Sequence, residues 1–176
     1  SELTTRSAIR DPFDPAGPLP AGACLLEASA GTGKTHTIAT LVARYVAEGR
    51  VDIRRILVVA FGRAASRELR DRVRERLIDA RRTLRDATED DEGGIRLDPA
   101  WQQLVAVDEA ERAARLERID RALAGIDDAP ILTTHGFAAR MLAQGGLASD
   151  VDPRETLCAD TGWLVDEVVN DLYLAK

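Results

Sequence analysis

One stretch of eight residues, Ala28-Ser-Ala-Gly-Thr-Gly-Lys-Thr35, constrains the fold of this chain more than any other. It matches the phosphate-binding loop pattern G-x-x-x-x-G-K-[ST], with Ala28 at the position of the first glycine. Gly31 and Gly33 allow the backbone to turn tightly and to bring N–H groups close to phosphate oxygens. An apolar run precedes the loop and a helical pattern follows it, so these N–H groups would lie at a helix N-terminus, which favours an anion. The pattern therefore predicts a nucleotide site between a strand and a helix.

Two side chains of the loop carry the expected chemistry. Lys34 can reach the β- and γ-phosphates of ATP, and the Thr35 hydroxyl can bind Mg²⁺. Lys34 is conspicuous because the chain has two lysines against 22 arginines. For His36 two interpretations stay open, a contact with the nucleotide or an exposed helix position. The predicted ATP site comprises Ala28, Ser29, Ala30, Gly31, Thr32, Gly33, Lys34, Thr35 and His36.

The composition indicates a soluble protein with a substantial core. The chain has 176 residues, of which 45% are apolar and 31% are charged. No apolar run approaches the length of a membrane span, and the polar, proline-rich residues 1–20 do not resemble a signal peptide. Two isolated cysteines are too few for a disulfide framework or a metal site. We therefore expect a cytoplasmic protein without a membrane partner.

The charge is unevenly distributed along the chain. A formal net charge of −6 argues against nucleic-acid binding, but residues 54–85 contain eleven arginines against four acidic residues. Such a basic segment is either a footprint for a phosphate backbone or a solvated helix face.

The apolar periodicity predicts strands alternating with helices. Strands are expected at residues 23–27, 55–61 and 130–134. Repeated strand–loop–helix units build a parallel sheet with helices on both faces. The loops 28–35, 62–63 and 134–136 would then meet at the carboxyl edge of that sheet. Helices are expected at 34–48, 64–84, 136–144 and 160–174, with one or two more across 99–107 and 108–124, and 86–94 is an expected acidic loop.

Three segments together resemble motifs I, Ia and Ib of the superfamily 1 helicases of the UvrD/Rep type, and within them the RecB-like subunits (exodeoxyribonuclease V beta) of RecBCD helicase–nucleases. The segments are Leu26-Glu-Ala-Ser-Ala-Gly-Thr-Gly-Lys-Thr35, Val58-Val-Ala-Phe-Gly-Arg-Ala-Ala-Ser-Arg-Glu-Leu-Arg-Asp-Arg72 and Leu132-Thr-Thr-His-Gly-Phe-Ala-Ala-Arg-Met-Leu142. The resemblance implies an α/β fold, a P-loop NTPase with a RecA-like parallel sheet and flanking helices. It implies a lead-in at 1–22, part of the first RecA-like domain at 23–146, and the start of a helical insertion at 147–176.

The resemblance also implies that motif I binds ATP with Mg²⁺ and that motifs Ia and Ib hold single-stranded DNA. Ala60-Phe61-Gly62 replaces the usual Thr-Phe-Thr, so the Gly62 N–H and Arg63 would have to substitute for the missing hydroxyls. His135 remains open between a DNA contact and a buried histidine, and Phe137 between contact and core. The implied DNA-binding residues are Phe61, Gly62, Arg63, Ala64, Thr133, His135 and Phe137.

The implied function is that of the ATP-binding part of an ATP-dependent DNA helicase and exonuclease subunit in double-strand break repair. Its partners would be single- and double-stranded DNA and RecC- and RecD-like subunits. Hydrolysis needs a Walker B carboxylate on a strand. Asp108-Glu109 follows an apolar run, but the sequence after it favours the start of a helix, so we expect a fragment that is inactive alone. The alternatives are a P-loop small-molecule kinase and a non-catalytic nucleotide-binding module.

Overall fold

The structure is a computed structural model that describes residues 13–29, 31, 33–87 and 98–144. It divides between residues 134 and 135 into two compact units. The predicted acidic loop at 86–94 and the predicted helix at 160–174 lie mostly or wholly outside the described residues. No helix of the described part is long and apolar enough to cross a membrane.

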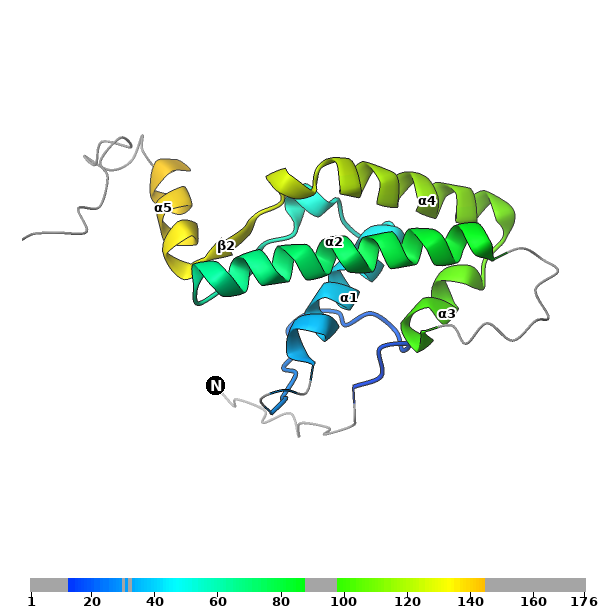
Figure 1. The fold of residues 1–176 in the computed structure, drawn as a ribbon, viewed down its shortest axis with the longest axis horizontal. Coiled ribbons are helices and arrows are strands. Elements are labelled where there is room, and N and C mark those ends of the chain that lie inside the picture. Colours follow the sequence, from blue (N-terminus) through cyan, green and yellow to red (C-terminus); the bar gives the residue numbers. More distant parts are fainter. Residues whose placement is uncertain (1–12, 30, 32, 88–97, 145–176) are drawn as a thin grey trace, which may run out of the picture. The chain divides into compact units, whose positions relative to one another are not determined.

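The first unit is built around three long helices. In Figure 1 α2 (Arg63–Asp86) runs across the view, with α4 (Glu109–Ala124) along one side and α1 (Lys34–Ala47) and α3 (Pro99–Val105) on the other. The apolar residues of α2 recur at helical spacing on its buried side, where Leu77 and not Ile78 is the buried residue of the middle turn. The buried side of α2 consists of Leu69, Val73, Arg76, Leu77, Ala80 and Leu84.

Two short parallel strands complete this unit. They are β1 (Val58–Ala60) and β2 (Ile131–Thr133), with Val58 opposite Ile131 and Ala60 opposite Thr133. Two short 3-10 turns, Ile53–Arg55 and Ile126–Asp128, precede the strands. The second unit contains most of α5 (Thr134–Gln144), which begins two residues before the position expected from the sequence.

The strand predicted at 23–27 is wrong. These residues form no strand, and Leu25 is 83% exposed. A strand requires a neighbour that completes its hydrogen bonds. Among the described residues the only sheet is the pair of β1 and β2, and residues 23–27 do not join it.

The strand predicted at 55–61 is shorter than expected and is not covered on both faces. Leu57 and Val59 are 47% and 45% exposed, whereas the alternate residues Ile56 and Val58 pack against the core. Within the described part of the first unit, helices therefore cover one face of β1. Alternate side chains point to opposite faces of a strand, so the other face remains open.

A buried guanidinium joins three helices of this unit. Arg76 on α2 is 7% exposed and lies 4.2 Å from the centre of the Trp101 ring. Its Nε donates to the Thr40 hydroxyl on α1 at 2.9 Å, and its Nη2 donates to Asp98 at the start of α3 at 2.6 Å. Burial raises the pKa of Asp98, but the N–H of Ala100 and the Arg76 guanidinium lower that pKa by more.

Helix α1 ends in a turn that requires glycine. Gly49 has φ +70°, its N–H donates to Val46, and the N–H of Arg50 donates to Tyr45. These bonds form a Schellman motif, which places its glycine in the left-handed region. A Cβ on Gly49 would also lie 3.0 Å from Cζ of Arg118 on α4.

We expect Gly49→Ala to destabilise the chain by about 1–2 kcal/mol, since left-handed backbone is unfavourable for alanine and Arg118 must move. Gly125→Ala is the matched control because Gly125 has φ −105° and its added Cβ would make ordinary contacts. Urea unfolding followed by circular dichroism measures both. Equal unfolding midpoints for the two variants would contradict this account of the turn.

We expect Asp98→Asn to lower stability near pH 7 and to lose this effect as the solution is acidified. The pKa of Asp98 is lowered in the folded state, so its carboxylate stabilises the fold above the unfolded pKa of about 3.9 and ceases to do so as pH falls through the folded pKa. Unfolding midpoints of both proteins at pH 7 and below pH 3 test this. A difference that grows on acidification would show that the charge of Asp98 opposes folding.

Candidate nucleotide-binding site

The phosphate loop has the backbone geometry that its glycines predict. Gly31 and Gly33 have φ +78° and +85°, and Gly33 is the N-cap of α1. Side chains larger than hydrogen are strained in this region, so both positions select glycine. The first N–H groups of α1 have no acceptor within the helix, which leaves donors and the positive end of the helix dipole at the loop.

Lys34 folds back over the loop that it follows. Its Nζ donates to the carbonyl oxygens of Ala28 and Ser29, each at 2.7 Å. An ammonium group has three donors, so these two bonds hold the charge at the loop and leave capacity for an anion. The structure thus places Ala28, Ser29, Gly31, Gly33 and Lys34 in one loop, as the sequence predicts.

The remaining predicted ATP-site residues differ in position. Thr35 is half-buried in the first turn of α1, and His36 is exposed beside it. The charge of His36 acts on Asp98, where it makes a smaller contribution to lowering that pKa. Ala30 and Thr32 lie outside the described residues. Within the described ranges, no group of three or more histidine, cysteine, aspartate or glutamate side chains is placed so that it could hold a metal ion.

A pocket of about 490 Å³ opens beside the loop. Lys34, Thr37 and Ile38 contribute from α1, and Phe13 contributes from the N-terminal lead-in. Phe13 is not among the residues that the sequence motif predicts for the site. The available signal was that Phe13 is the only aromatic residue in the first 44. The other lining residues are Leu26, Glu27, Ala28 and Ser29.

The end of β1 exposes part of the predicted DNA-binding segment. Phe61 is 98% exposed, and Gly62 is extended (φ −128°) before α2 begins at Arg63. Arg63 and Ala64 are also exposed. Since β1 and β2 are parallel and Ala60 lies opposite Thr133, both strands end at the same edge.

Thr133 is half-buried at the end of β2. In the second unit, His135 is exposed and Phe137 is half-buried on α5. Exposure of His135 removes the interpretation of a buried histidine.

The basic segment on α2 is not a uniform cationic face. Arg72 pairs with Glu75 and Arg74 with Asp127, and Arg81 and Arg85 both pair with Asp120.

Arg70 braces α2 against β2 by donating to the Ile131 carbonyl at 3.2 Å. In the first turns of α2, Arg63 and Arg67 are exposed.

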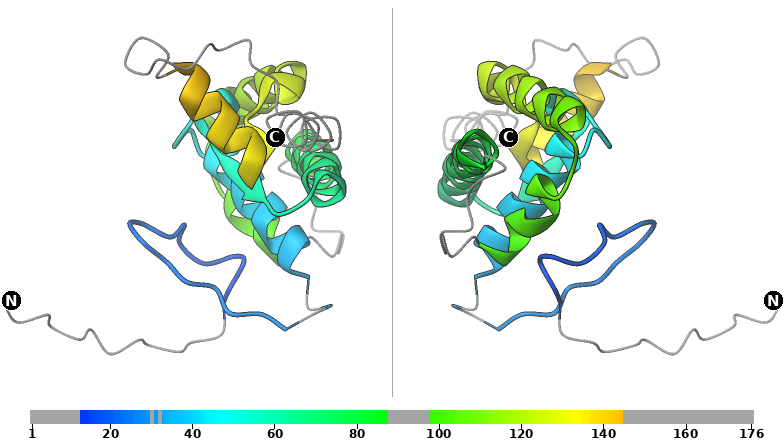
Figure 2. Two further views of the ribbon diagram at one scale, coloured as in Figure 1. Left: turned by 90° about the vertical axis from the view of Figure 1, so that its left-hand side faces the viewer. Right: turned by 90° about the vertical axis from the view of Figure 1, so that its right-hand side faces the viewer.

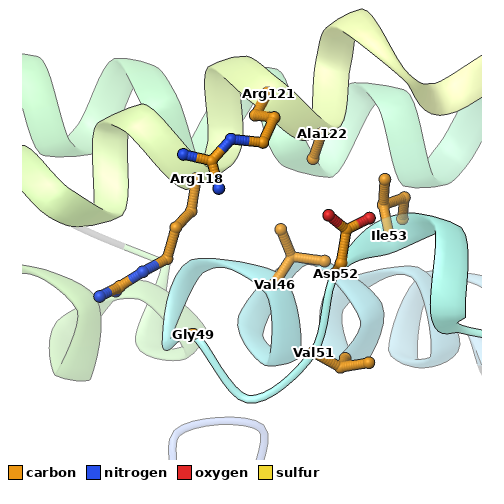
Figure 3. Close-up of a pocket in the computed structure, with 8 residues that line it drawn as sticks. All are labelled: Val46, Gly49, Val51, Asp52, Ile53, Arg118, Arg121 and Ala122. Carbon is orange, nitrogen blue, oxygen red and sulfur yellow. The ribbon is translucent and has the colours of Figure 1, made fainter.

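A second cavity, of about 170 Å³, is structural (Figure 3). Arg118 and Arg121 of α4 border it, and both are already partnered. Arg118 donates to the Ala47 carbonyl and to Glu111, and Arg121 donates to Glu117. The remaining lining residues are Val46, Gly49, Val51, Asp52, Ile53 and Ala122.

Comparison with known proteins agrees with the motifs. The family model for the UvrD/REP helicase N-terminal domain matches residues 14–172. The chain is 45% identical over 165 residues to the RecBCD enzyme subunit RecB of Mycolicibacterium smegmatis, covering 93% of this chain and 14% of that protein. It is 42% identical over 173 residues to the subunit of that name from Mycobacterium tuberculosis, covering 94% of this chain and 15% of that protein.

A more distant relative shows the same relationship. The RecBCD enzyme subunit RecB of Escherichia coli is 31% identical over 178 residues, covering 95% of this chain and 14% of that protein. The chain thus spans about one seventh of the length of these relatives. The match covers the phosphate loop and both strands, and the chain belongs to the UvrD/REP helicase family.

Proposed function

We propose that this chain is the ATP-binding part of an ATP-dependent DNA helicase and nuclease subunit of the RecB type, acting in recombinational repair of double-strand breaks. The observation that carries the proposal is the phosphate loop, where Gly31 and Gly33 adopt positive φ and Lys34 lies over the loop at the start of α1. The similarity to RecB subunits over more than nine tenths of the chain supports the same function.

In this proposal the phosphates of ATP bind at the N-terminus of α1. The N–H groups of the first turn donate to phosphate oxygens, and Lys34 adds its positive charge. Mg²⁺, which favours oxygen ligands, would be held by the Thr35 hydroxyl together with the phosphates. The bound ion would neutralise phosphate charge during hydrolysis.

Single-stranded DNA would pass the edge where β1 and β2 end. The exposed ring of Phe61 offers a stacking surface to a base, and Arg63 offers a charge to the phosphate backbone. We assign Gly62, Ala64 and Thr133 to this interface on the basis of the motif resemblance. By the same resemblance, we propose that His135 and Phe137 of the second unit also bind DNA.

The carboxylate that completes ATP hydrolysis does not come from Asp108. Its side chain accepts the N–H of Glu111 at 2.8 Å and caps α4. The sequence-based interpretation of Asp108-Glu109 as a helix start is therefore confirmed. We propose that this carboxylate lies in a part of the protein that the present chain does not span, since the chain covers only 14–15% of its RecB relatives. We also propose RecC- and RecD-like partners, because these relatives are named as subunits of a RecBCD enzyme.

We expect Lys34→Ala to weaken MgATP binding by at least about tenfold, because a hydrogen bond to a charged group contributes about 1.5–3 kcal/mol. Thr35→Val keeps the side-chain shape but should abolish the part of the affinity that depends on Mg²⁺. Titration calorimetry on the intact polypeptide, with and without Mg²⁺, measures both. Lys176→Ala, at the other lysine of the sequence, is the control. Equal ATP affinities of Lys34→Ala and the control would refute the phosphate-loop assignment.

We expect Arg63→Ala and Phe61→Ala to weaken single-stranded DNA binding in different ways. Loss of one phosphate contact should reduce the slope of log affinity against log salt by about one. Loss of base stacking should weaken binding about tenfold at every salt concentration and leave the slope unchanged. Fluorescence anisotropy over a salt series distinguishes them, with Arg82→Ala at the far end of α2 as the control. Wild-type slope and affinity in both variants would remove motif Ia from the DNA interface.

A further inference from the structure

Two arginines are buried among the described residues, Arg44 on α1 and Arg76 on α2. Nη1 of Arg44 donates to the carbonyl oxygens of Pro15 and Gly17 at 2.8 and 2.7 Å. Its Nη2 pairs with Glu48 of the same stretch of chain at 2.7 Å. Arg44 therefore fastens the N-terminal lead-in to α1. Arg76 has a different role, because its partners lie on other helices.

The bond between Arg76 and Thr40 connects two helices that begin at different binding segments. α1 follows the phosphate loop, and α2 follows the motif Ia segment. Thr40 is 2% exposed and lies six residues after Lys34, which is about 9 Å along the helix. Its hydroxyl accepts from Nε of Arg76 at 2.9 Å. The two helices pack directly against each other, and Figure 2 shows α2 almost end-on.

The second partner of Arg76 is sensitive to charge near the phosphate loop. Nη2 of Arg76 donates to the Asp98 carboxylate at 2.6 Å. Burial raises the pKa of Asp98, whereas hydrogen bonds and the charges of Arg76 and His36 lower it by more. His36 makes the smallest of these contributions, and it lies directly after Thr35 in the first turn of α1. A charge bound at the loop would therefore act on Asp98 as well as on α1.

The buried partners of Arg76 prevent α1 and α2 from moving independently. A guanidinium is planar, so its donors have fixed directions. If α1 moved along α2, a buried donor of Arg76 would lose its acceptor, which is unfavourable. The ring of Trp101 lies 4.2 Å from the guanidinium and restricts it further. Closer to the start of α2, Arg70 donates to the Ile131 carbonyl, so a movement of α2 also affects the strand pair.

We infer that Arg76 is a positioning residue that couples the phosphate loop to the motif Ia segment through its bond to Thr40. The inference rests on the proposed function, because it needs a nucleotide at Lys34 and DNA at Phe61 and Arg63. Phosphates bound at the N-terminus of α1 shift that helix, Arg76 follows Thr40, and α2 moves together with its first turn. Arg76 is buried and does not itself bind either ligand. It sets how strongly the affinity for one ligand depends on the other.

The experiment measures how much a bound nucleotide changes the affinity for DNA. Fluorescence anisotropy of a labelled single strand gives this affinity for the intact polypeptide. The strand is titrated without nucleotide and with the magnesium complex of a non-hydrolysable ATP analogue. In the wild type the two dissociation constants should differ by about fivefold or more. DNA should change the affinity for the analogue by the same factor, because coupling between two sites is reciprocal.

Three variants and a control test the role of the bond. Thr40→Val removes the hydroxyl, and Arg76→Met replaces the buried charge by an apolar side chain. Both should bring the ratio of dissociation constants to within about twofold of one, while each ligand alone binds within about threefold of wild type. Thr40→Ser retains the hydroxyl and should keep the wild-type ratio. Arg74→Ala is the matched control, because Arg74 lies on the same helix and pairs with the exposed Asp127.

Trp101 provides a second readout, because its ring lies against the guanidinium of Arg76. Trp163→Phe leaves Trp101 as the single tryptophan of the chain. The ATP analogue should change the fluorescence of this protein, and Thr40→Val should remove that change. Circular dichroism shows whether each variant is folded, and Thr40→Val alone tests the proposal if Arg76→Met does not fold.

A wild-type ratio in Thr40→Val and in the folded Arg76→Met, or a ratio of one in the wild type, would overturn the coupling. Equal losses in Thr40→Ser and Thr40→Val would also overturn it, since the hydroxyl would then not be the cause. Failure of the proposed function gives a different result. In that case Lys34→Ala binds the analogue as tightly as the wild type does, or the wild type binds no DNA, and the inference loses its basis.

Discussion

The packing of the first unit depends on the hydrogen bonds and the opposite charge that compensate the buried guanidinium of Arg76. A charge removed from water destabilises a fold unless hydrogen bonds and an opposite charge compensate it. Arg76 obtains these from three directions, the Thr40 hydroxyl on α1, the Asp98 carboxylate before α3 and the face of Trp101. Arg76 lies on the helix that follows motif Ia, and Thr40 lies on the helix that follows the phosphate loop. The same cluster therefore joins the helices that extend from the two proposed binding segments.

Much of the helical structure could be predicted from the sequence because local signals coincide with the packing. Gly33 and Gly49 bracket α1, Asp98 and Asp108 cap the two helices that follow them, and the apolar spacing on α2 identifies its buried face. The sheet was harder to predict. An apolar run indicates that a segment can be buried in a sheet, but it does not identify the elements that pack against the segment. Residues 23–27 pair with no strand among the described residues, and one face of β1 remains exposed.

In the candidate site too, one part could be predicted from the sequence and another could not. The phosphate loop was predictable because its chemistry requires particular residues at adjacent positions. Phe13 was not, because its place depends on contacts between residues 27 to 29 positions apart, in which Arg44 bonds to backbone carbonyls. Any residue supplies a carbonyl, so no side-chain pattern marks such acceptors. The roles of the arginines on α2 could not be predicted either, because they depend on the carboxylate or carbonyl oxygens that the folded chain places beside each guanidinium.

The parallel register of β1 and β2 has a consequence for the order of folding. The paired residues Val58 and Ile131 are separated by more than seventy positions, and α2, α3 and α4 lie between them. Closing so long a loop for a few ladder bonds is entropically unfavourable until the intervening helices have shortened the distance. We therefore expect the helices to dock before the strands pair. The edge that we assign to DNA would then form last in this unit, and its presence would show that the helical core has formed.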